Sequence, residues 1–132
     1  MAEDEIKLEI KERLEIARRR LKAASLLLRN SMLDDASNRI YYGVFSAAKA
    51  MLNSIGSNPK THSGLLTEFG LRAVKTNLVA KTYGSTLRKA FEMRESSDYE
   101  IGAELGKEEV ETLLKEAEGF VTMAEKFVKE RI

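Results

Sequence analysis

The segment RESSDY contains three side chains that could take part in chemistry: Arg94, Asp98 and Tyr99. A guanidinium is always charged and can bind a phosphate through two hydrogen bonds at once. Arg94 is therefore a candidate phosphate contact. The alternative is structural, since Arg94 would also be satisfied by pairing with Asp98 or with glutamates near the C-terminus.

A second group of polar side chains lies in the segment SNRIYYGVF, residues 37–45. Asn38 and Arg39 precede Tyr42 by four and three residues, so all three share one face of a helix. Polar groups on an otherwise apolar central helix must find partners or line a cleft. Two interpretations stay open: a cleft shared with Arg94, or a satisfied internal network. Tyr41 is directed elsewhere, and we expect it in the core.

The chain has one histidine, His62, and no cysteine. This composition rules out a multi-histidine metal site within one chain, a thiolate site and a disulfide. We therefore expect no metal site and no cofactor. A lone histidine in a loop after Pro59 is typical of a cap or surface group. His62 gains a catalytic role only if it reaches Arg94, within the chain or across a dimer.

Apolar residues recur at helical spacing along most of the sequence, and these stripes predict the elements that position the polar groups. One proline and eight glycines among 132 residues leave few turn signals, which favours helices over strands. The clearest loop signal is the run GSNPK, and residues 96–106 are predicted to form a second loop. The predicted helices are 3–29, 33–56, 63–76, 79–95 and 107–130. We expect one domain, residues 1–132, folded as an all-α, four- to five-helix up-and-down bundle.

Charge is unevenly distributed although the net charge is +1. Residues 49–94 hold eight basic and two acidic side chains, whereas residues 95–132 hold five basic and eleven acidic ones. The two segments either pack together and neutralise each other or leave a basic face for a nucleotide or RNA phosphate. No stretch is apolar enough to span a membrane, and the charged N-terminus has no signal-peptide pattern. We therefore expect a cytoplasmic protein without membrane contact.

The segment 37–45, the turn KTHSGL at 60–65 and the element RESSDY at 94–99 occur in an order that resembles one prokaryotic branch of the HEPN family. In that branch an alanine, an arginine, a Tyr-Tyr pair and a phenylalanine lie on the second helix. A Lys-x-His-like turn follows that helix, and an Arg-x-x-x-Asp-Tyr element follows the fourth. The resemblance covers about residues 10–130, which is nearly the whole chain.

The resemblance implies a helical bundle that forms a homodimer. Many members are encoded beside a small nucleotidyltransferase and act with it as a toxin–antitoxin pair. Active toxins of the family are metal-independent RNases that use an Arg-x4-to-6-His motif assembled across the dimer. This chain has Tyr99 where the four-residue form of that motif has histidine, and a phenol is a poor base at neutral pH.

Two functions follow from this comparison. The first is a HEPN module that binds a nucleotidyltransferase partner, and also nucleotide or RNA, without cleaving it. The second is a metal-independent RNase that uses Arg94 with Tyr99 or His62. For the first function, we expect a binding site in which the polar residues of the second helix approach those that end the fourth. Its members are Asn38, Arg39, Tyr42, Arg94, Asp98 and Tyr99.

Overall fold

A computed structural model describes residues 2–99 and 105–132, with the side chains of residues 98 and 99 left out of the description. Within this part of the chain all regular structure is helical, as predicted. A five-residue π-helical turn, Gly70–Val74, follows the third of the helices. The α-helices are α1 (Ala2–Arg29), α2 (Leu33–Ser54), α3 (His62–Phe69), α4 (Lys81–Tyr99) and α5 (Lys107–Lys129).

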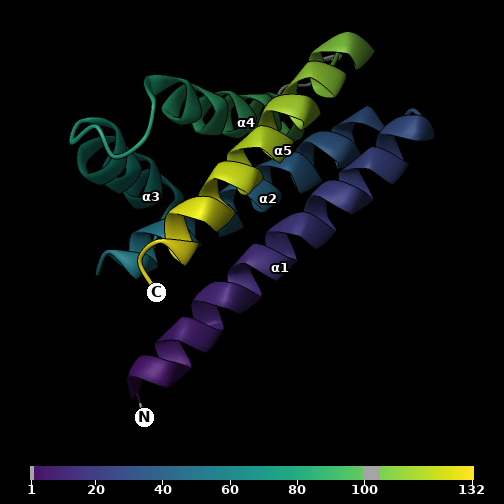
Figure 1. Ribbon diagram of the computed structural model, residues 1–132. Helices are drawn as coiled ribbons and strands as arrows, with labels where there is room; N and C mark the ends of the chain where they lie inside the picture. The colour runs from purple at the N-terminus through teal and green to yellow at the C-terminus, as the bar shows by residue number, and fades with distance from the viewer. Residues whose placement is uncertain (1, 100–104) are drawn as a thin grey trace.

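α1 and α2 are long neighbouring helices joined by a three-residue connection, and they run in opposite directions (Figure 1). The predicted apolar stripe of α1 is buried from Ile10 to Leu28. Ile6, the first residue of that predicted stripe, is 49% exposed. The N-terminal end of α1 projects beyond the other helices in Figure 1, which explains this exposure.

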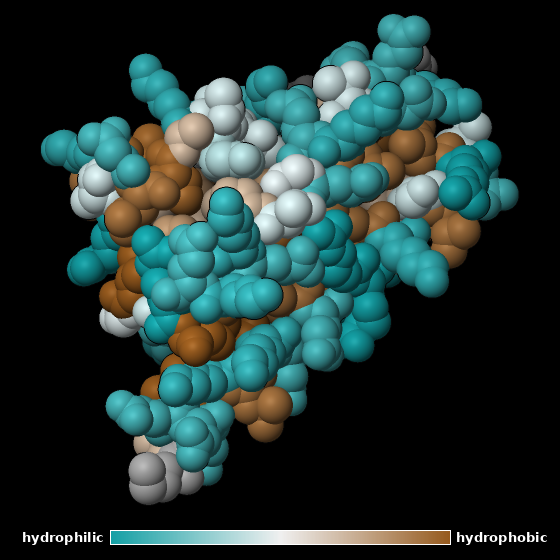
Figure 2. All heavy atoms as spheres, viewed as in Figure 1, coloured by the Kyte–Doolittle hydropathy of each residue, from teal (hydrophilic) through white to brown (hydrophobic). Residues whose placement is uncertain are grey.

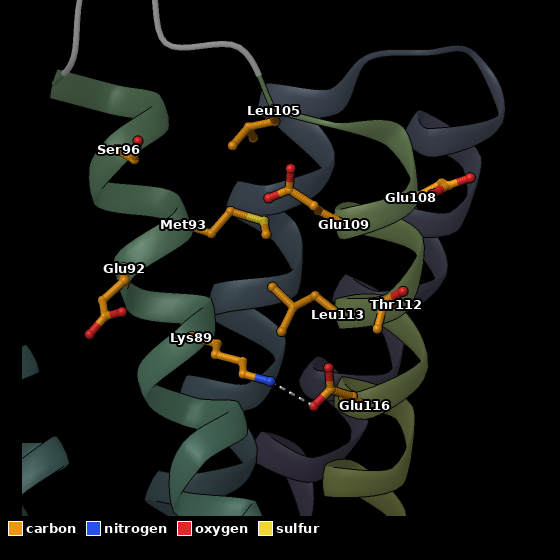
Figure 3. Close-up of a pocket in the computed structure, with 10 residues that line it drawn as sticks. All are labelled: Lys89, Glu92, Met93, Ser96, Leu105, Glu108, Glu109, Thr112, Leu113 and Glu116. Carbon is orange, nitrogen blue, oxygen red and sulfur yellow. Dashed lines mark ion pairs between the residues drawn. The ribbon is translucent and has the colours of Figure 1, made fainter.

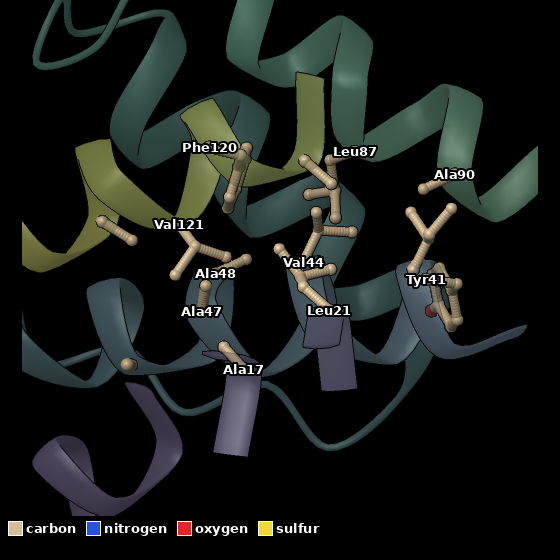
Figure 4. Close-up of a cluster of buried hydrophobic side chains, with 14 of the residues drawn as sticks. Ala17, Leu21, Tyr41, Val44, Ala47, Ala48, Leu87, Ala90, Phe120 and Val121 are labelled. Atoms are coloured by element: carbon tan, nitrogen blue, oxygen red, sulfur yellow. The ribbon is translucent and has the colours of Figure 1, made fainter. Parts of the chain in front are cut away.

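α2 is the central helix, because it packs against α1, α3, α4 and α5. Twelve of its residues are buried, as befits a helix that contacts four others. Figure 4 shows side chains of α1, α2, α4 and α5 meeting around Val44 and Ala47. Tyr41 lies on one side of this core, beneath α4. The core therefore fixes the position of the polar residues that α2 carries.

The third helix was predicted to span residues 63–76, and its predicted C-terminal end is wrong. An α-helix ends at Phe69, and the chain then widens into the π-helical turn that Lys75 closes by donating its N–H to the Gly70 carbonyl at 2.9 Å. Glycine is a weak helix former, so a change of helix type at Gly70 has a low energetic cost. The predicted gap between the helices 63–76 and 79–95 is present, and Asn77 within it has a φ of 62°.

The fourth predicted helix, residues 79–95, begins two residues later and runs four residues further. The loop predicted from Ser96 is therefore wrong for residues 96–99, which are the last turn of α4. Serine and aspartate have modest helix propensity, but packing of α4 against α2 and α5 outweighs that preference. The last helix agrees with its predicted bounds to within one residue.

Polar and charged side chains cover much of the face seen in Figure 2, with apolar patches between them. None of the helices described is both long and apolar enough to cross a bilayer. Ion pairs connect the acidic C-terminal segment to two other helices. Arg18 of α1 binds Glu125 through two hydrogen bonds, of 2.7 and 3.1 Å, and Lys89 of α4 lies 3.6 Å from Glu116. Only the second of these pairs joins segment 49–94 to segment 95–132, so the predicted neutralisation between those segments is seen at Lys89 and Glu116.

Candidate functional site

Five side chains from three helices form a half-buried group that we call the Arg94 cluster: Tyr41, Tyr42, Phe45, His62 and Arg94. Tyr41, Tyr42 and Phe45 come from α2, His62 is the first residue of α3, and Arg94 lies in the second half of α4. Ring centroids within the cluster lie 4.9 to 6.4 Å apart. Phe91 of α4 closes one side, with its ring 5.8 Å from that of Tyr41.

The local sequence before α3 fixes the position of His62. The Thr61 side chain accepts a hydrogen bond of 2.9 Å from the Gly64 N–H and caps the helix. The preceding loop is anchored to the end of α2, because the Asn53 amide donates to the Ser57 carbonyl at 3.0 Å. His62 is therefore held at a defined helix start, whereas the sequence predicted a loop position.

Arg94 lies over the faces of two tyrosine rings. Its guanidinium carbon is 5.4 Å from the ring centroid of Tyr41 and 5.3 Å from that of Tyr42. Distances below about 6 Å permit a cation–π attraction. The two aromatic faces therefore help to place a permanently charged guanidinium within the cluster.

The Tyr41 hydroxyl forms a hydrogen bond with Nδ1 of His62. Burial raises the pKa of the Tyr41 phenol above its usual range, although the Arg94 charge opposes this rise. Burial also lowers the pKa of His62, and Arg94 lowers it further, whereas Glu95 raises it. Both groups are therefore neutral near pH 7. A neutral phenol is a donor, so we assign Tyr41 as donor to Nδ1, which leaves the proton of His62 on Nε2.

The structure brings two of the predicted site residues together. Arg94 and Tyr42 are in contact as described above. Asn38 is half-buried and Arg39 exposed on α2, and neither side chain forms a hydrogen bond or ion pair with any described residue. The side chains of Asp98 and Tyr99 lie outside the described residues. Binding and catalytic roles for all six remain predictions.

Two members of the cluster were not predicted in their present role. Tyr41 is fully buried, as expected of a core residue, but its hydroxyl serves the polar cluster. His62 was expected to matter only if it reached Arg94, and the two are close enough for the Arg94 charge to shift the pKa of His62. The sequence gave no sign of the contact between Tyr41 and His62, because these two residues are 21 positions apart.

Away from the Arg94 cluster, a cavity of about 670 Å³ lies between α4 and α5 (Figure 3). Its walls carry four glutamates, three apolar side chains and one lysine, which is paired with Glu116. An excess of carboxylates repels a phosphate, so this cavity does not suit the anion that Arg94 would bind. Among the described residues no group of three or more histidine or acidic side chains is arranged to hold a metal ion.

These helices and their arginine–aromatic cluster define an all-α bundle with a candidate anion site on its central helix. The family model for the HEPN domain matches residues 10–127. The chain therefore belongs to the HEPN domain family, as the sequence motifs indicated.

Relatives of similar length support this assignment. "Putative toxin MJ0605" of Methanocaldococcus jannaschii is 37% identical over 126 residues, which cover 96% of this chain and 93% of that protein. A "UPF0332 protein" of Thermotoga maritima is 39% identical over 114 residues, which cover 86% of each chain. "Putative toxin MJ0142", also of M. jannaschii, is 34% identical over 122 residues, or 92% of this chain and 83% of that protein.

Proposed function

We propose that this protein is the HEPN component of a toxin–antitoxin-type pair and that its Arg94 cluster binds a phosphate group of a nucleotide or RNA. The observation that carries this proposal is the guanidinium of Arg94, held over Tyr41 and Tyr42. The names of two relatives, each called a "putative toxin", support the first half of the proposal.

The chemistry of the cluster fits a nucleotide better than a simple anion. Arg94 supplies a permanent positive charge and paired N–H donors for phosphate oxygens. Tyr42 is half-buried, and its aromatic ring would contact the base of a nucleotide whose phosphate binds at Arg94. The Nε2–H of His62 would be a further donor to an anion bound beside Arg94.

The binding test compares two arginines of the same helix. Arg94→Gln removes the guanidinium of the cluster, whereas Arg88→Gln removes an exposed one outside it. We expect Arg94→Gln to weaken binding of AMP, measured by calorimetry, by roughly 10- to 100-fold, because a hydrogen bond to a charged group is worth about 1.5–3 kcal/mol. Arg88→Gln should bind as the wild type does. Equal affinity of all three proteins would contradict the role of Arg94.

The partner in this proposal is a small nucleotidyltransferase. A neighbouring reading frame with a Gly-Ser and paired-Asp signature would support it, and co-expression with that protein should yield a complex on gel filtration. Failure of the two purified proteins to associate at micromolar concentration would contradict the pairing.

A homodimer is also part of the proposal. Exposed apolar side chains on the projecting end of α1, Ile6 and Leu8, offer surface for a second copy. Light scattering at micromolar concentration should give twice the mass of one chain. A monomer mass would contradict the dimer but would leave the phosphate site to its own test.

A second candidate function is metal-independent RNA cleavage, which the position of His62 beside Arg94 favours. In such a reaction the 2′-oxygen attacks the adjacent phosphorus and the bond to the 5′-oxygen breaks, which yields a 2′,3′-cyclic phosphate and a 5′-hydroxyl. Arg94 would stabilise the negative charge on the phosphorane oxygens. The 2′-hydroxyl proton would pass to water as the 2′-oxygen attacks. The imidazolium form of His62 would donate its Nε2 proton to the leaving 5′-oxygen and so return to the neutral imidazole, and Tyr99 is the alternative proton-transfer group.

The cleavage test uses RNA in EDTA with the wild type and with His62→Gln, Arg94→Gln and Arg88→Gln. If the reaction occurs, the first two variants should lose at least about 100-fold in rate, whereas Arg88→Gln should keep it. Absence of cyclic phosphate with the wild type would exclude this candidate and leave the binding module.

A further inference from the structure

One face of α2 carries a narrow stripe of half-buried residues, which we call the α2 stripe: Asn38, Tyr42, Phe45, Lys49 and Asn53. Their spacing of four, three, four and four residues places them along one side of the helix. Between residues 40 and 52, all residues of α2 that do not belong to the stripe are buried. The stripe is therefore the one part of this helix segment that a ligand can reach.

The first half of the stripe belongs to the Arg94 cluster. Arg94 lies over Tyr42, and the His62 ring lies 4.9 Å from that of Phe45. The second half leads to a different cavity, of about 320 Å³, between the N-terminal part of α1 and the end of α2. Lys49 and Asn53 line this cavity from the stripe.

Three cations meet in this second cavity: Arg13 from α1, Lys49 from α2 and Lys60 from the loop before α3. The Nε atom of Arg13 is buried and meets no hydrogen-bond acceptor among the described residues. Glu9 contributes the single carboxylate of the lining, 3.9 Å from Arg13, and its side chain is 62% exposed. The cavity thus gathers more positive charge than its own carboxylate balances.

The electrostatic surroundings of Lys49 agree with this geometry. Burial lowers the pKa of Lys49, and the charges of Arg13 and Lys60 lower it further, whereas Glu9 opposes them. These three cations repel one another in the free protein. A bound anion would remove that repulsion.

We infer that the cavity lined by Arg13, Lys49 and Lys60 binds a second phosphate group of the RNA strand whose first phosphate binds at Arg94. Along α2, Lys49 lies seven residues, or about 10 Å, beyond Tyr42. A stacked strand advances about 3.4 Å per nucleotide, so roughly three nucleotides span that distance. Phe45 lies between Tyr42 and Lys49 along α2 and would contact an intervening base. The strand in this inference rests on the proposed function, whereas the anion site rests on the cavity itself.

The test uses the double variant Lys49→Gln/Lys60→Gln, with Lys75→Gln/Lys81→Gln as a matched control at two exposed lysines outside the cavity. The probes are inorganic phosphate, AMP and a fluorescent 2′-O-methyl RNA of about ten nucleotides, which cannot be cleaved through its 2′-oxygen. We expect the double variant to bind the oligonucleotide roughly tenfold more weakly and with a salt slope reduced by about one, whereas AMP binding stays unchanged. Phosphate should shift the amide NMR signals of Ser57 and Asn58 in the wild type but not in this variant.

The outcomes separate the two proposals. Weak oligonucleotide binding by Arg94→Gln, together with wild-type binding by Lys49→Gln/Lys60→Gln, would overturn the second site and keep the first. If no protein binds the oligonucleotide but phosphate still shifts the two amides, the proposed function and the strand both fail, and the cavity is a site for free phosphate. A changed mass of the double variant in light scattering, without any phosphate effect, would make the cavity a protein interface and overturn the inference.

Discussion

The two sides of α2 differ in burial and in polarity. One side packs small and apolar residues such as Ala47 and Val44 against α1 and α5, and the buried Ser46 hydroxyl has its partner there, since it donates to the Arg13 carbonyl at 2.7 Å. The other side, the α2 stripe, holds aromatic rings and a lysine at half burial, with Arg94, His62 and Arg13 near them. Close packing therefore sets the position of α2, whereas charge and hydrogen bonding determine the properties of the side chains on the α2 stripe.

The largest effect should come from the packed side. Phe120 of α5 is fully buried, and its ring lies 5.5 Å from that of Phe69. Phe120→Ala should lower the free energy of unfolding by about 3–5 kcal/mol in urea denaturation, because it leaves a cavity. Leu71→Ala, at a residue 52% exposed, should change it by less than about 0.5 kcal/mol. Similar losses in both variants would mean that the core is not closely packed.

A smaller effect is expected where the two sides meet, at Tyr41. Tyr41→Phe keeps the ring but leaves Nδ1 of His62 without its donor, so unfolding free energy should fall by about 1–3 kcal/mol. Tyr83→Phe makes the same chemical change at a hydroxyl without a hydrogen bond among the described residues. Its effect, measured by the same denaturation, should be near zero. Equal effects of the two changes would remove the hydrogen bond as the cause.

Acidification tests the polar side alone. The unfolded chain binds a proton at His62 near pH 6.5, whereas the folded chain binds it only at lower pH, because the pKa is lowered. The unfolded state therefore holds more protons below about pH 6.5, and stability falls as pH falls through that value towards the folded pKa. Melting temperatures at pH 7 and pH 5 should differ less in His62→Gln than in the wild type. An unchanged difference would show that His62 is not desolvated.

The smallest effect concerns the charges around His62, and the single histidine makes its NMR titration unambiguous. Arg94→Gln should raise the pKa of His62 by removing a positive charge, and Glu95→Gln should lower it by removing a negative one. Arg88→Gln is the matched control and should leave it unchanged. A shift in the opposite direction in either of the first two variants would place His62 away from these groups.

Sequence periodicity predicted α1, α2 and α5 well, because each has an apolar stripe that continues for many turns. The turn Gly70–Val74 and the C-terminal end of α4 were not predicted. Both depend on packing that outweighs weak local preferences, and such packing leaves no periodic signal in so few residues.

Only part of the candidate site was predictable from the sequence. Helical spacing and the resemblance together suggested that Tyr42 and Arg94 lie near each other, and the structure has them in contact. The hydrogen bond between Tyr41 and His62 joins residues that no local pattern relates. Its existence depends on the length of the loop after α2 and on the Thr61 cap, and both act through the tertiary fold.

The three-residue connection between α1 and α2 also determines the order in which the two phosphate-binding candidates assemble. Closing so short a loop loses little chain entropy, and contacts close in sequence form early in folding. Arg13 and Lys49 lie on this helix pair, whereas Arg94 and His62 arrive with α4 and α3. During synthesis, which proceeds from the N-terminus, the cationic cavity therefore gains its first two residues before the Arg94 cluster can form. A nascent chain would carry part of its anion-binding surface before it carries the residues proposed for chemistry.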